Sequence, residues 1–382
     1  MEAKDRQRIF LSVFFFLSGF CFSSWASRIP TIKNSFGLND AELGTILLAM
    51  PFSSMAGLPI SGWLVTKYDS RIPLLGAFML VAFSLSLIGF AQHPFVLVSA
   101  ICLFAFGLRI LNISINTQAL TIQKLFDRKI NGAFHGLWST GGIAGILFCT
   151  ILVTFDVPMN IHLVIVSLLT LGITFYSHRF LIRNDRSETG NRLKFGKPDP
   201  FIQNLGLLVF FAALCEGGMF DWSGIFFREI VKEEIFTLGY LIFMVFMSLS
   251  RFLSDRIAES IGVPRTYLMS ATLIFIGICL ALIFPSFWPV MLGFSLVGFG
   301  TAAVIPMTYT LAGTSKKYSP GMAISIIVTY GIVGMLIGPP LIGYLSHAFN
   351  LKVSFITFAV AGLMLIPVSR LVFKYQGKDH GF

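Results

Sequence analysis

Two carboxyl groups interrupt an apolar stretch of membrane-spanning length. Glu216 and Asp221 lie within the segment of about residues 203–227, and they are the only two of the 18 acidic residues that we place at membrane depth. An ionisable side chain in hydrocarbon costs at least about 2.5–3.5 kcal/mol, so it usually marks an ion or substrate pathway. The alternative is structural: a carboxyl capped by a neighbouring helix or kept wet near the interface. We expect both acids to be functional.

The spacing of the two acids predicts different roles for them. Five residues along an α-helix turn the side chain by about 140°, so Glu216 and Asp221 point in different directions. A carboxyl held away from water takes up a proton more readily than an exposed one, as a proton carrier requires. We assign Glu216 to proton or substrate chemistry. Asp221 is a candidate for a gate or packing contact that also serves proton coupling, and the adjacent Trp222 is a candidate substrate contact.

A second polar face lies on the fourth long apolar segment. Arg109, Asn112 and Asn116 are spaced i, i+3 and i+7 and so share one face of a helix, and Gln118 follows closely. We take all four as candidate substrate contacts. A guanidinium does not lose its proton, so Arg109 needs a partner near mid-span. Glu216 is the carboxylate nearest in depth, and the alternative is an arginine that reaches a backbone carbonyl or the interface.

Aromatic and basic residues lie near the ends of two other segments. Trp25 and Arg28 share a helix face on the first apolar segment, where a substrate contact competes with an interfacial aromatic beside a snorkelling base. His135 and Trp138 lie near one end of the fifth segment, and a histidine can titrate at physiological pH. We take Trp25 and Trp138 as candidate substrate contacts. His135 is a candidate proton-coupling group, with helix packing as its alternative.

The chain that carries these residues consists mainly of long apolar runs. Hydrophobic residues make up 55% of the sequence and charged residues 12%, against roughly 25% charged in an average soluble domain. Twelve runs are long enough to cross a bilayer, which predicts an all-α membrane protein. They cover about residues 9–27, 41–65, 73–92, 95–119, 131–154, 161–180, 203–227, 237–257, 266–285, 288–312, 321–345 and 351–373.

The loops are short, so no soluble domain fits between the runs. The longest, 181–202, is polar and indicates a cytoplasmic linker between an N-terminal six-helix bundle, 1–180, and a C-terminal one, 203–382. The five cysteines lie inside apolar runs without metal-ligand spacing, so we expect free thiols, no metal and no cofactor. The sequence has no phosphate-binding GxxxxGKS/T motif and no nucleophile–base set, which argues against an ATP-driven pump and against an enzyme.

The basic residues predict how the chain crosses the membrane. With the N-terminus in the cytoplasm, 22 of the 28 Lys and Arg residues fall on the cytoplasmic side, Arg251 among them. Five fall on the other side, and Arg109 lies within a span. Because short cytoplasmic loops carry the excess of positive charge, both termini are expected in the cytoplasm. The high pI therefore reflects topology and predicts no nucleic-acid partner.

The two halves of the chain resemble each other. A shift of 189 residues places 62–67 on 251–256 in the sequence. The same shift matches five residues of a glycine-rich segment, Gly132, Thr140, Gly142, Ile143 and Gly145, with Gly321, Thr329, Gly331, Ile332 and Gly334. Duplicated halves are a known transporter arrangement, with the site between the halves near the midplane. The repeat predicts two pseudo-symmetric bundles.

The loop that begins at Gly62 reads Gly-Trp-Leu-Val-Thr-Lys. It resembles the glycine-x-leucine-x-acid-arginine loop signature of the major facilitator superfamily, with Thr66 in place of the acid. The second-half copy keeps the acid and base but has Arg251 for the glycine. Such charges at helix ends can hold the two halves together on the cytoplasmic side, and plain positive-inside charge is the alternative. Candidate gating residues are Lys67, Arg71, Asp255 and Arg256.

Longer stretches carry a more specific resemblance. They are 25–30, 112–119, 134–142, 216–223 and 338–343. Together they look like one branch of the superfamily, typified by the membrane protein of the rhizopine gene cluster, and the resemblance covers nearly the whole chain. It implies the two-bundle major facilitator fold, with a central cavity lined by the first, fourth, seventh and tenth spans, and an association with inositol- or sugar-like compounds. In that fold Arg109 and Glu216 would face one cavity, and we hypothesise that they are electrostatically coupled.

The predicted function is secondary active transport of a small polar organic solute, sugar- or inositol-like, across the bacterial inner membrane. Transport would proceed by alternating access, as a proton symport. Pro339 and Pro340 should bend or break the eleventh helix and are candidate gating residues. A multidrug or organic-cation exporter and a non-transporting sensor with a transporter fold are the alternatives. The expected partners are the solute, protons and the lipid bilayer, and the expected state is a monomer.

Overall fold

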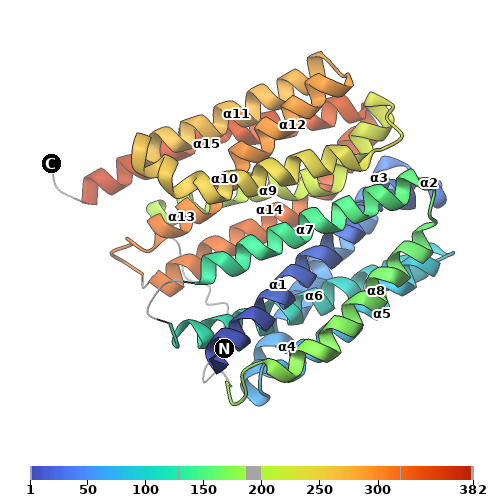
Figure 1. The fold of residues 1–382 in the computed structure, drawn as a ribbon. Coiled ribbons are helices and arrows are strands. Elements are labelled where there is room, and N and C mark those ends of the chain that lie inside the picture. Colours follow the sequence, from blue (N-terminus) through green and yellow to red (C-terminus); the bar gives the residue numbers. More distant parts are fainter. Residues whose placement is uncertain (1, 127–129, 186–198, 319, 380–382) are drawn as a thin grey trace. The chain divides into compact units, whose positions relative to one another are not determined.

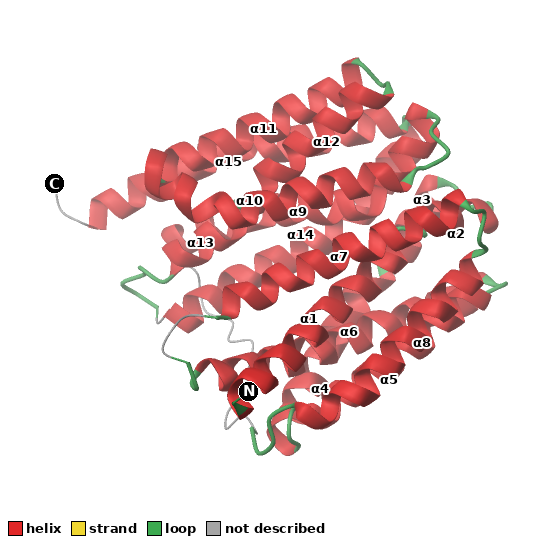
Figure 2. Cartoon of the chain, viewed as in Figure 1, coloured by secondary structure: helices red, strands yellow, loops and turns green. Residues whose placement is uncertain are grey.

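A computed structural model describes residues 2–126, 130–185, 199–318 and 320–379 of the chain. Every regular element in these residues is a helix, and they contain no strand (Figure 2). Within the described residues, 12 helical segments are long and apolar enough to cross a membrane. The predicted all-α membrane fold is therefore confirmed.

The chain divides into two compact units, and each is described by itself. The first unit comprises Met1–Gly37 and Ala49–Arg192, and the second comprises Leu38–Leu48 and Leu193–Phe382. The predicted bundles place 38–48 in the first half, whereas its contacts group it with the second. Of the predicted linker, 181–202, the structure describes only the two ends.

The helices of the first unit begin near the N-terminus and end before the linker (Figure 1). They are α1 (Ala3–Ala26), α2 (Ile29–Ser35), α4 (Ala49–Lys67), α5 (Arg71–Phe90), α6 (Pro94–Gln123), α7 (Asn131–Thr154), α8 (Met159–Ser177) and a 3₁₀ turn, His178–Phe180.

The second unit takes one short helix from the first half of the sequence and the remaining helices from the second half. They are α3 (Asp40–Leu47), α9 (Pro200–Phe226), which continues as a π-helical turn (Phe227–Val231), α10 (Thr237–Ile261), α11 (Val263–Ile283), α12 (Phe287–Ala302), α13 (Val304–Ala312), α14 (Pro320–Ala348) and α15 (Leu351–Asp379).

Local sequence signals explain where some of these helices begin. Asp199 precedes α9, and its carboxylate accepts a hydrogen bond from the backbone N–H of Ile202 at 2.9 Å. The first residue of α9 is a proline, which has no N–H and so leaves no unpaired donor at this helix end. At α3, Asn39 and Glu42 form a reciprocal capping box, each side chain bonded to the other's backbone N–H at 2.9 Å. These caps fix the entry of the two helices into the second unit.

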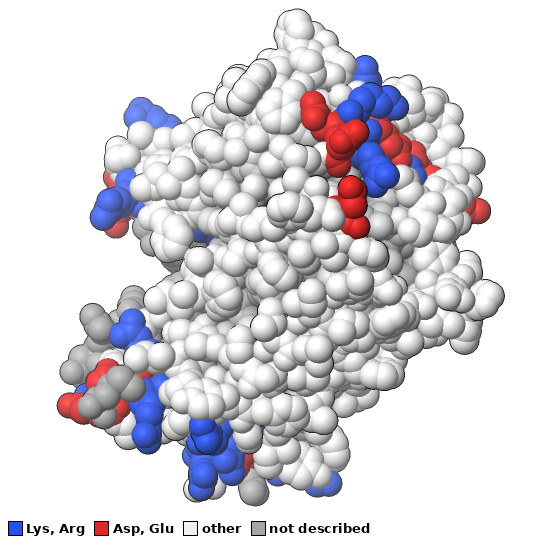
Figure 3. Space-filling model, turned by 45° about the vertical axis from the view of Figure 1, so that its right-hand side comes forward, with Lys and Arg blue, Asp and Glu red and all other residues white. Residues whose placement is uncertain are grey.

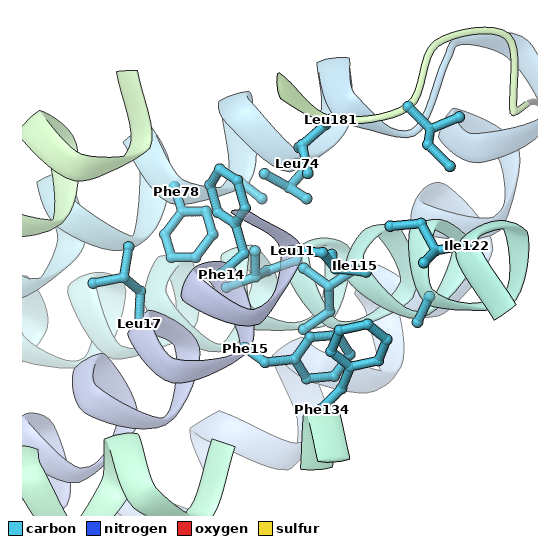
Figure 4. Packing of buried hydrophobic residues seen from close by; sticks show 14 of the residues in the cluster. Leu11, Phe14, Phe15, Leu17, Leu74, Phe78, Ile115, Ile122, Phe134 and Leu181 are labelled. Carbon is cyan, nitrogen blue, oxygen red and sulfur yellow. The ribbon is translucent and has the colours of Figure 1, made fainter. Parts of the chain in front are cut away.

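The core of the first unit is a cluster of large apolar side chains (Figure 4). Phe14 and Phe15 project from α1, Phe78 from α5, Ile115 from α6 and Phe134 from α7, and each is less than a tenth exposed. The rings of Phe15 and Phe134 stack with their centres 5.1 Å apart. Because lipid is as apolar as these side chains, close packing rather than removal from water holds such helices together.

The two units repeat one packing pattern. In the first, α1 packs against α7, α4 and α5 pack against α6, and α5 packs against α8. In the second, α9 packs against α14, α10 and α11 pack against α12, and α11 packs against α15. When the helices are numbered as membrane spans from one to twelve, adding six to both numbers of a packed pair in the first unit gives the corresponding packed pair in the second. The packing agrees with the internal repeat predicted from the sequence.

Matched glycines make the same helix crossing in each unit. A Cβ added at Gly145 of α7 would lie 2.6 Å from the carbonyl oxygen of Phe20 in α1. At Gly334 of α14, which corresponds to Gly145 under the shift of 189, an added Cβ would collide with the carbonyl oxygen of Phe210 in α9. Only glycine allows the backbones to approach this closely.

The surface is largely uncharged. On the face shown in Figure 3, Lys, Arg, Asp and Glu gather in a few groups, and residues of other types make up the rest. Large apolar side chains are exposed along the helices, for example Phe95, which is 82% exposed, and Trp288, which is 76% exposed. An apolar exterior of this kind suits contact with lipid.

Candidate functional site

Glu216 forms an ion pair inside the second unit. Its Oε1 lies 2.7 Å from Nη2 of Arg251, which donates a hydrogen bond to it. The Glu216 side chain is 7% exposed and the Arg251 side chain 32%. Both residues fall within candidate membrane spans, on α9 and α10 respectively. A charge-assisted bond of this length is among the stronger hydrogen bonds in proteins.

The partner of Glu216 differs from the one expected. From the sequence, Arg109 was expected to pair with Glu216, and Arg251 was counted with the basic residues of the cytoplasmic side. In the structure Arg251, near the end of the candidate span Thr237–Ser254, pairs with Glu216. Under the internal repeat, Arg251 stands where the first half has Gly62. Arg251, which replaces the glycine of the loop signature, is therefore the residue that neutralises the buried Glu216 carboxylate.

A phenol lies near this pair. Tyr309 is on α13, which packs against α9, and its hydroxyl is within electrostatic range of the Glu216 carboxylate. Glu216, Arg251 and Tyr309 thus come from three helices of the same unit.

Asp221 and Trp222 follow Glu216 on α9 and have different surroundings. The structure shows no ion pair for Asp221 among the described residues, and its side chain is half-buried. Trp222 is completely buried, and within the described chain its indole N–H has no hydrogen-bond partner. The predicted roles of Glu216 and Asp221 stay predictions.

Arg109 lies on α6 of the first unit and faces α4. Its Nε donates to the hydroxyl of Ser54 at 2.8 Å. A Cβ added at Gly57 would lie 3.2 Å from Cβ and Cγ of Arg109, so the arginine stem lies directly over the backbone of α4. Further along the helix, the Asn116 side-chain amide donates to the backbone carbonyl of Asn112 at 2.8 Å, and Asn112 is exposed. The predicted polar face is present on α6.

Gln118 does not belong to that face, contrary to its assignment as a substrate contact. It is completely buried, and its amide nitrogen donates to Ser70 Oγ, the Ile182 carbonyl and Asp185 Oδ2 at 2.7, 3.0 and 2.8 Å. Its Oε1 accepts the N–H of Ile182 at 3.1 Å. Nine residues turn an α-helix by about 180°, so Gln118 points away from Arg109. Its role is to tie the start of the linker to the loop before α5.

The aromatic candidates differ in accessibility. Trp25 packs beside Phe104 with ring centres 6.0 Å apart and is 1% exposed, and Trp222 is buried as well. Neither indole is open to a solute in this structure, so their assignment as substrate contacts is not supported by the geometry. Trp138 is half-buried and His135 is exposed on α7. These two stay candidates for substrate contact and proton coupling.

The candidate gating residues of the loops make local contacts. Lys67 Nζ lies 4.7 Å from the centre of an indole ring on its own helix. Arg71 Nε lies 4.0 Å from the Asp69 carboxylate. Arg256 is exposed, and the side chain of Asp255 lies outside the described residues. Their predicted role in holding the two halves together stays a prediction.

Pro339 and Pro340 do not break their helix. α14 is continuous from Pro320 to Ala348 and contains both prolines. The prolines instead form a packing surface, because a Cβ added at Gly44 of α3 would lie 3.0 Å from the Pro339 carbonyl oxygen and 3.1 Å from Pro340 Cα. The helix also packs against α9.

The described residues hold no group of three or more His, Cys, Asp or Glu side chains that could bind a metal ion. All five cysteines are free thiols.

Comparison with known proteins shows to which family the chain belongs. The sequence matches the profile of the Major Facilitator Superfamily over residues 2–148 and 205–381. The chain belongs to the major facilitator superfamily. This is a family of transporters rather than enzymes, so the protein is a membrane transporter.

Relatives and solved structures agree with this assignment. An uncharacterised MFS-type transporter of Yersinia pestis is 30% identical over 365 residues, which cover 95% of this chain and 94% of the relative. The membrane protein MosC of Rhizobium meliloti is 28% identical over 361 residues, which cover 93% and 87%. MosC represents the rhizopine gene cluster, so the predicted resemblance to that branch is confirmed.

The fold is shared with more distant transporters. A variant of the nucleoside transporter NupG superposes with a TM-score of 0.79 at 12% identity and covers 97% of this chain and 100% of NupG. A bacterial homolog of human Spinster, in an inward-facing and occupied conformation, superposes with a TM-score of 0.72 at 14% identity and covers 96% and 93%. At this identity the likeness shows the fold alone.

Three polar residues of this major facilitator protein, two of them buried, were given no functional role from the sequence. Arg251 and Asp185 stood at the ends of apolar runs, where positive-inside charge and linker residues are expected. His162 is completely buried and accepts a hydrogen bond from Nε of Arg28 at 3.1 Å, and Arg28 also donates to the Val157 carbonyl at 3.0 Å. The arginine at the usual glycine of the loop signature was the signal that could have revealed the first of them.

Proposed function

We propose that this transporter is a secondary active carrier that moves a small polar organic solute, sugar- or inositol-like, across the inner membrane by alternating access. Proton movement through Glu216 drives it as a symport. Both termini lie in the cytoplasm, as the distribution of Lys and Arg favours.

The observation that carries this proposal is the Glu216–Arg251 ion pair within two membrane spans. A carboxylate at this depth is costly, and a pair of opposite charges offers two states of similar cost. In one state Glu216 is ionised and holds Arg251. In the other a proton neutralises Glu216, and Arg251 is free to bond elsewhere. Exchange between these states links one proton to one change of the helix contacts.

The polar face of α6 is the proposed solute contact. Arg109, Asn112 and Asn116 carry donors and acceptors that suit hydroxyl groups, and Asn112 is exposed. Asp221, His135 and Trp138 are secondary candidates, the first two for proton coupling and the third for a solute contact. A sugar- or inositol-like solute fits such a set better than an apolar one, since each hydroxyl must replace the hydrogen bonds that it made with water.

The first step of the test is to identify a solute that the protein binds. The purified protein is screened by thermal shift against sugars, inositols, amino acids and organic cations. The compound that stabilises it most is then followed as a radiolabel in proteoliposomes. Uphill uptake under a proton gradient is compared with one-for-one exchange at equal pH, for the wild type, for Glu216→Gln and for Glu234→Gln. Glu234 is an exposed carboxylate shortly before α10, so this variant is the matched control.

We expect Glu216→Gln to abolish uphill uptake and to retain exchange, while Glu234→Gln matches the wild type. Concentrative uptake that survives in Glu216→Gln overturns the proton role of this residue. A wild type that moves none of the stabilising compounds overturns transport itself and favours a sensor with a transporter fold.

A further inference from the structure

Arg109 carries a permanent charge in the middle of an apolar helix. It is the sixteenth of the 30 residues of α6, whose apolar part forms one of the candidate membrane spans. A guanidinium stays protonated at any physiological pH, so it cannot avoid the cost of its position by losing charge. Such a residue requires a partner of opposite charge or a strong set of acceptors.

The protein supplies Arg109 with only a neutral acceptor. Within the described residues its one polar contact is the bond from Nε to the Ser54 hydroxyl, and no carboxylate is paired with it. The most deeply buried carboxylate of the second unit, Glu216, already has a guanidinium 2.7 Å away. Within the described residues, the first unit therefore gives the charge of Arg109 no counter-charge.

The side chain of Arg109 is also held in one place. Its stem lies over Gly57, where an added Cβ would come within 3.2 Å of it, and its Nε is bonded to Ser54 one turn earlier on α4. With Nε occupied, the two terminal amino groups form the free end of the guanidinium. They present parallel N–H donors in the geometry that suits both oxygens of a carboxylate.

Neutral polar groups lie beside this charge. Asn112 and Asn116 follow on the same face of α6, and the Asn112 side chain is exposed. An amide can donate to one hydroxyl and accept from another, whereas neither asparagine adds charge. The face therefore combines one fixed positive charge with uncharged hydrogen-bonding groups.

We propose that the solute of this transporter is a hydroxylated organic anion, a small sugar- or polyol-derived carboxylate. Arg109 binds its carboxylate end-on, and Asn112 and Asn116 bind its hydroxyl groups. This inference rests on the proposed transport function and specifies its substrate class. It disfavours the organic-cation alternative, because a cation would be brought beside an unneutralised guanidinium.

The test uses three probes that share one ring and differ in charge. Glucuronate is the anion, glucose the neutral compound and glucosamine the cation. Their binding to the purified transporter is measured by isothermal titration for the wild type, Arg109→Gln, Arg109→Lys and Ser54→Ala. Arg183→Gln removes an exposed arginine of the same unit and is the matched control.

We expect the wild type to bind glucuronate at least about tenfold more tightly than glucose, and glucosamine most weakly, since a bond to a charged partner commonly exceeds one tenfold step in affinity. Arg109→Gln should erase the preference for glucuronate. Arg109→Lys, which keeps the charge but loses the fork, should retain part of it, and Ser54→Ala should weaken it by less than Arg109→Gln. Arg183→Gln should match the wild type.

Other outcomes overturn the inference. These are a wild type that prefers glucose or glucosamine, a wild type that binds none of the three probes, and an Arg109→Gln variant that keeps the full preference for glucuronate. The proposed function is scored separately by flux. Transport of glucose without binding of glucuronate would overturn the inferred substrate class and leave the proposed transport function standing. Binding of glucuronate through Arg109 without flux would overturn the transport function and leave the inferred binding role of Arg109 standing.

Discussion

Glu216 on α9 and Arg251 on α10 neutralise each other across 2.7 Å inside one six-helix unit. The pair joins two neighbouring helices of the same unit and lies within apolar spans. Its two members have different exposure, since Glu216 is nearly enclosed and Arg251 retains about a third of its side-chain surface. Removal of the Arg251 charge should therefore destabilise the protein more than removal of the Glu216 charge, because it leaves the enclosed carboxylate without a partner.

The stability of the protein should depend on this asymmetry. Arg251→Gln leaves an enclosed carboxylate without its partner, and we expect a loss of about 2 kcal/mol, below the 3–5 kcal/mol of a fully buried pair because Arg251 is partly exposed. Glu216→Gln should cost less, and the double variant should recover part of the loss of Arg251→Gln. Thermal unfolding in detergent measures each. Strictly additive losses would show that the two side chains do not interact.

The anchor of the linker should be a second source of stability. Asp185 accepts the backbone N–H of Ser70 at 2.9 Å, the Ser70 hydroxyl and the Gln118 amide at 2.8 Å. Asp185→Ala leaves the backbone N–H and the hydroxyl of Ser70 without their acceptor and removes one of the acceptors of the Gln118 amide, which we expect to cost about 2–4 kcal/mol. Arg183→Ala, an exposed change two residues earlier, is the control.

The same anchor gives a coupling prediction. Because Gln118 and Asp185 share one hydrogen-bonded cluster, Gln118→Ala should cost much less in an Asp185→Ala background than in the wild type. Equal effects of Gln118→Ala in both backgrounds, again measured by thermal unfolding, would mean that the cluster does not act as a unit.

Apolar pattern and glycine spacing predicted most of the fold. Twelve runs and one shift of 189 residues indicated the spans and the repeat, and the shift matched Gly145 with Gly334, where the helices cross closely. The grouping of 38–48 with the second unit was not predicted, because nothing in α3 marks its contact with α14 before the helices are packed.

The candidate site was predicted less completely. Depth along the helix found Glu216 and Arg109, since a charge inside an apolar run is visible in the sequence. Direction around the helix was harder to predict, and Gln118, a candidate substrate contact, is completely buried on another side of α6. The partner of Glu216 was also missed, because a residue at the end of an apolar run can reach inward along its long side chain, as Arg251 does.

The helix crossing of the repeat gives a matched pair of variants. Gly145→Ala and Gly334→Ala each place a methyl group against a carbonyl oxygen of the neighbouring helix, and we expect each to cost roughly 1–3 kcal/mol of stability. Gly172→Ala is the control, because a Cβ there meets no atom within 4 Å. Tolerance of both changes would show that the crossing is looser than the structure has it.

Arg28 and His162 give another stability prediction. Nδ1 of His162 accepts from Arg28, so the ring is neutral with its proton on Nε2. His162→Phe fills similar space but removes the acceptor, and we expect a loss of about 1–3 kcal/mol in thermal unfolding. His162→Gln should retain part of the stability, and the exposed His93→Phe should have no effect. Equal stability of the Phe and Gln variants would argue against the bond.

Proton movement through Glu216 is measured most directly with a pH electrode. Proteoliposomes in weakly buffered medium receive the solute that stabilises the protein most, and the external pH is followed as the solute enters. The account predicts alkalinisation for the wild type and for Glu234→Gln, and none for Glu216→Gln although its one-for-one exchange continues. An unchanged pH response in Glu216→Gln would contradict the account.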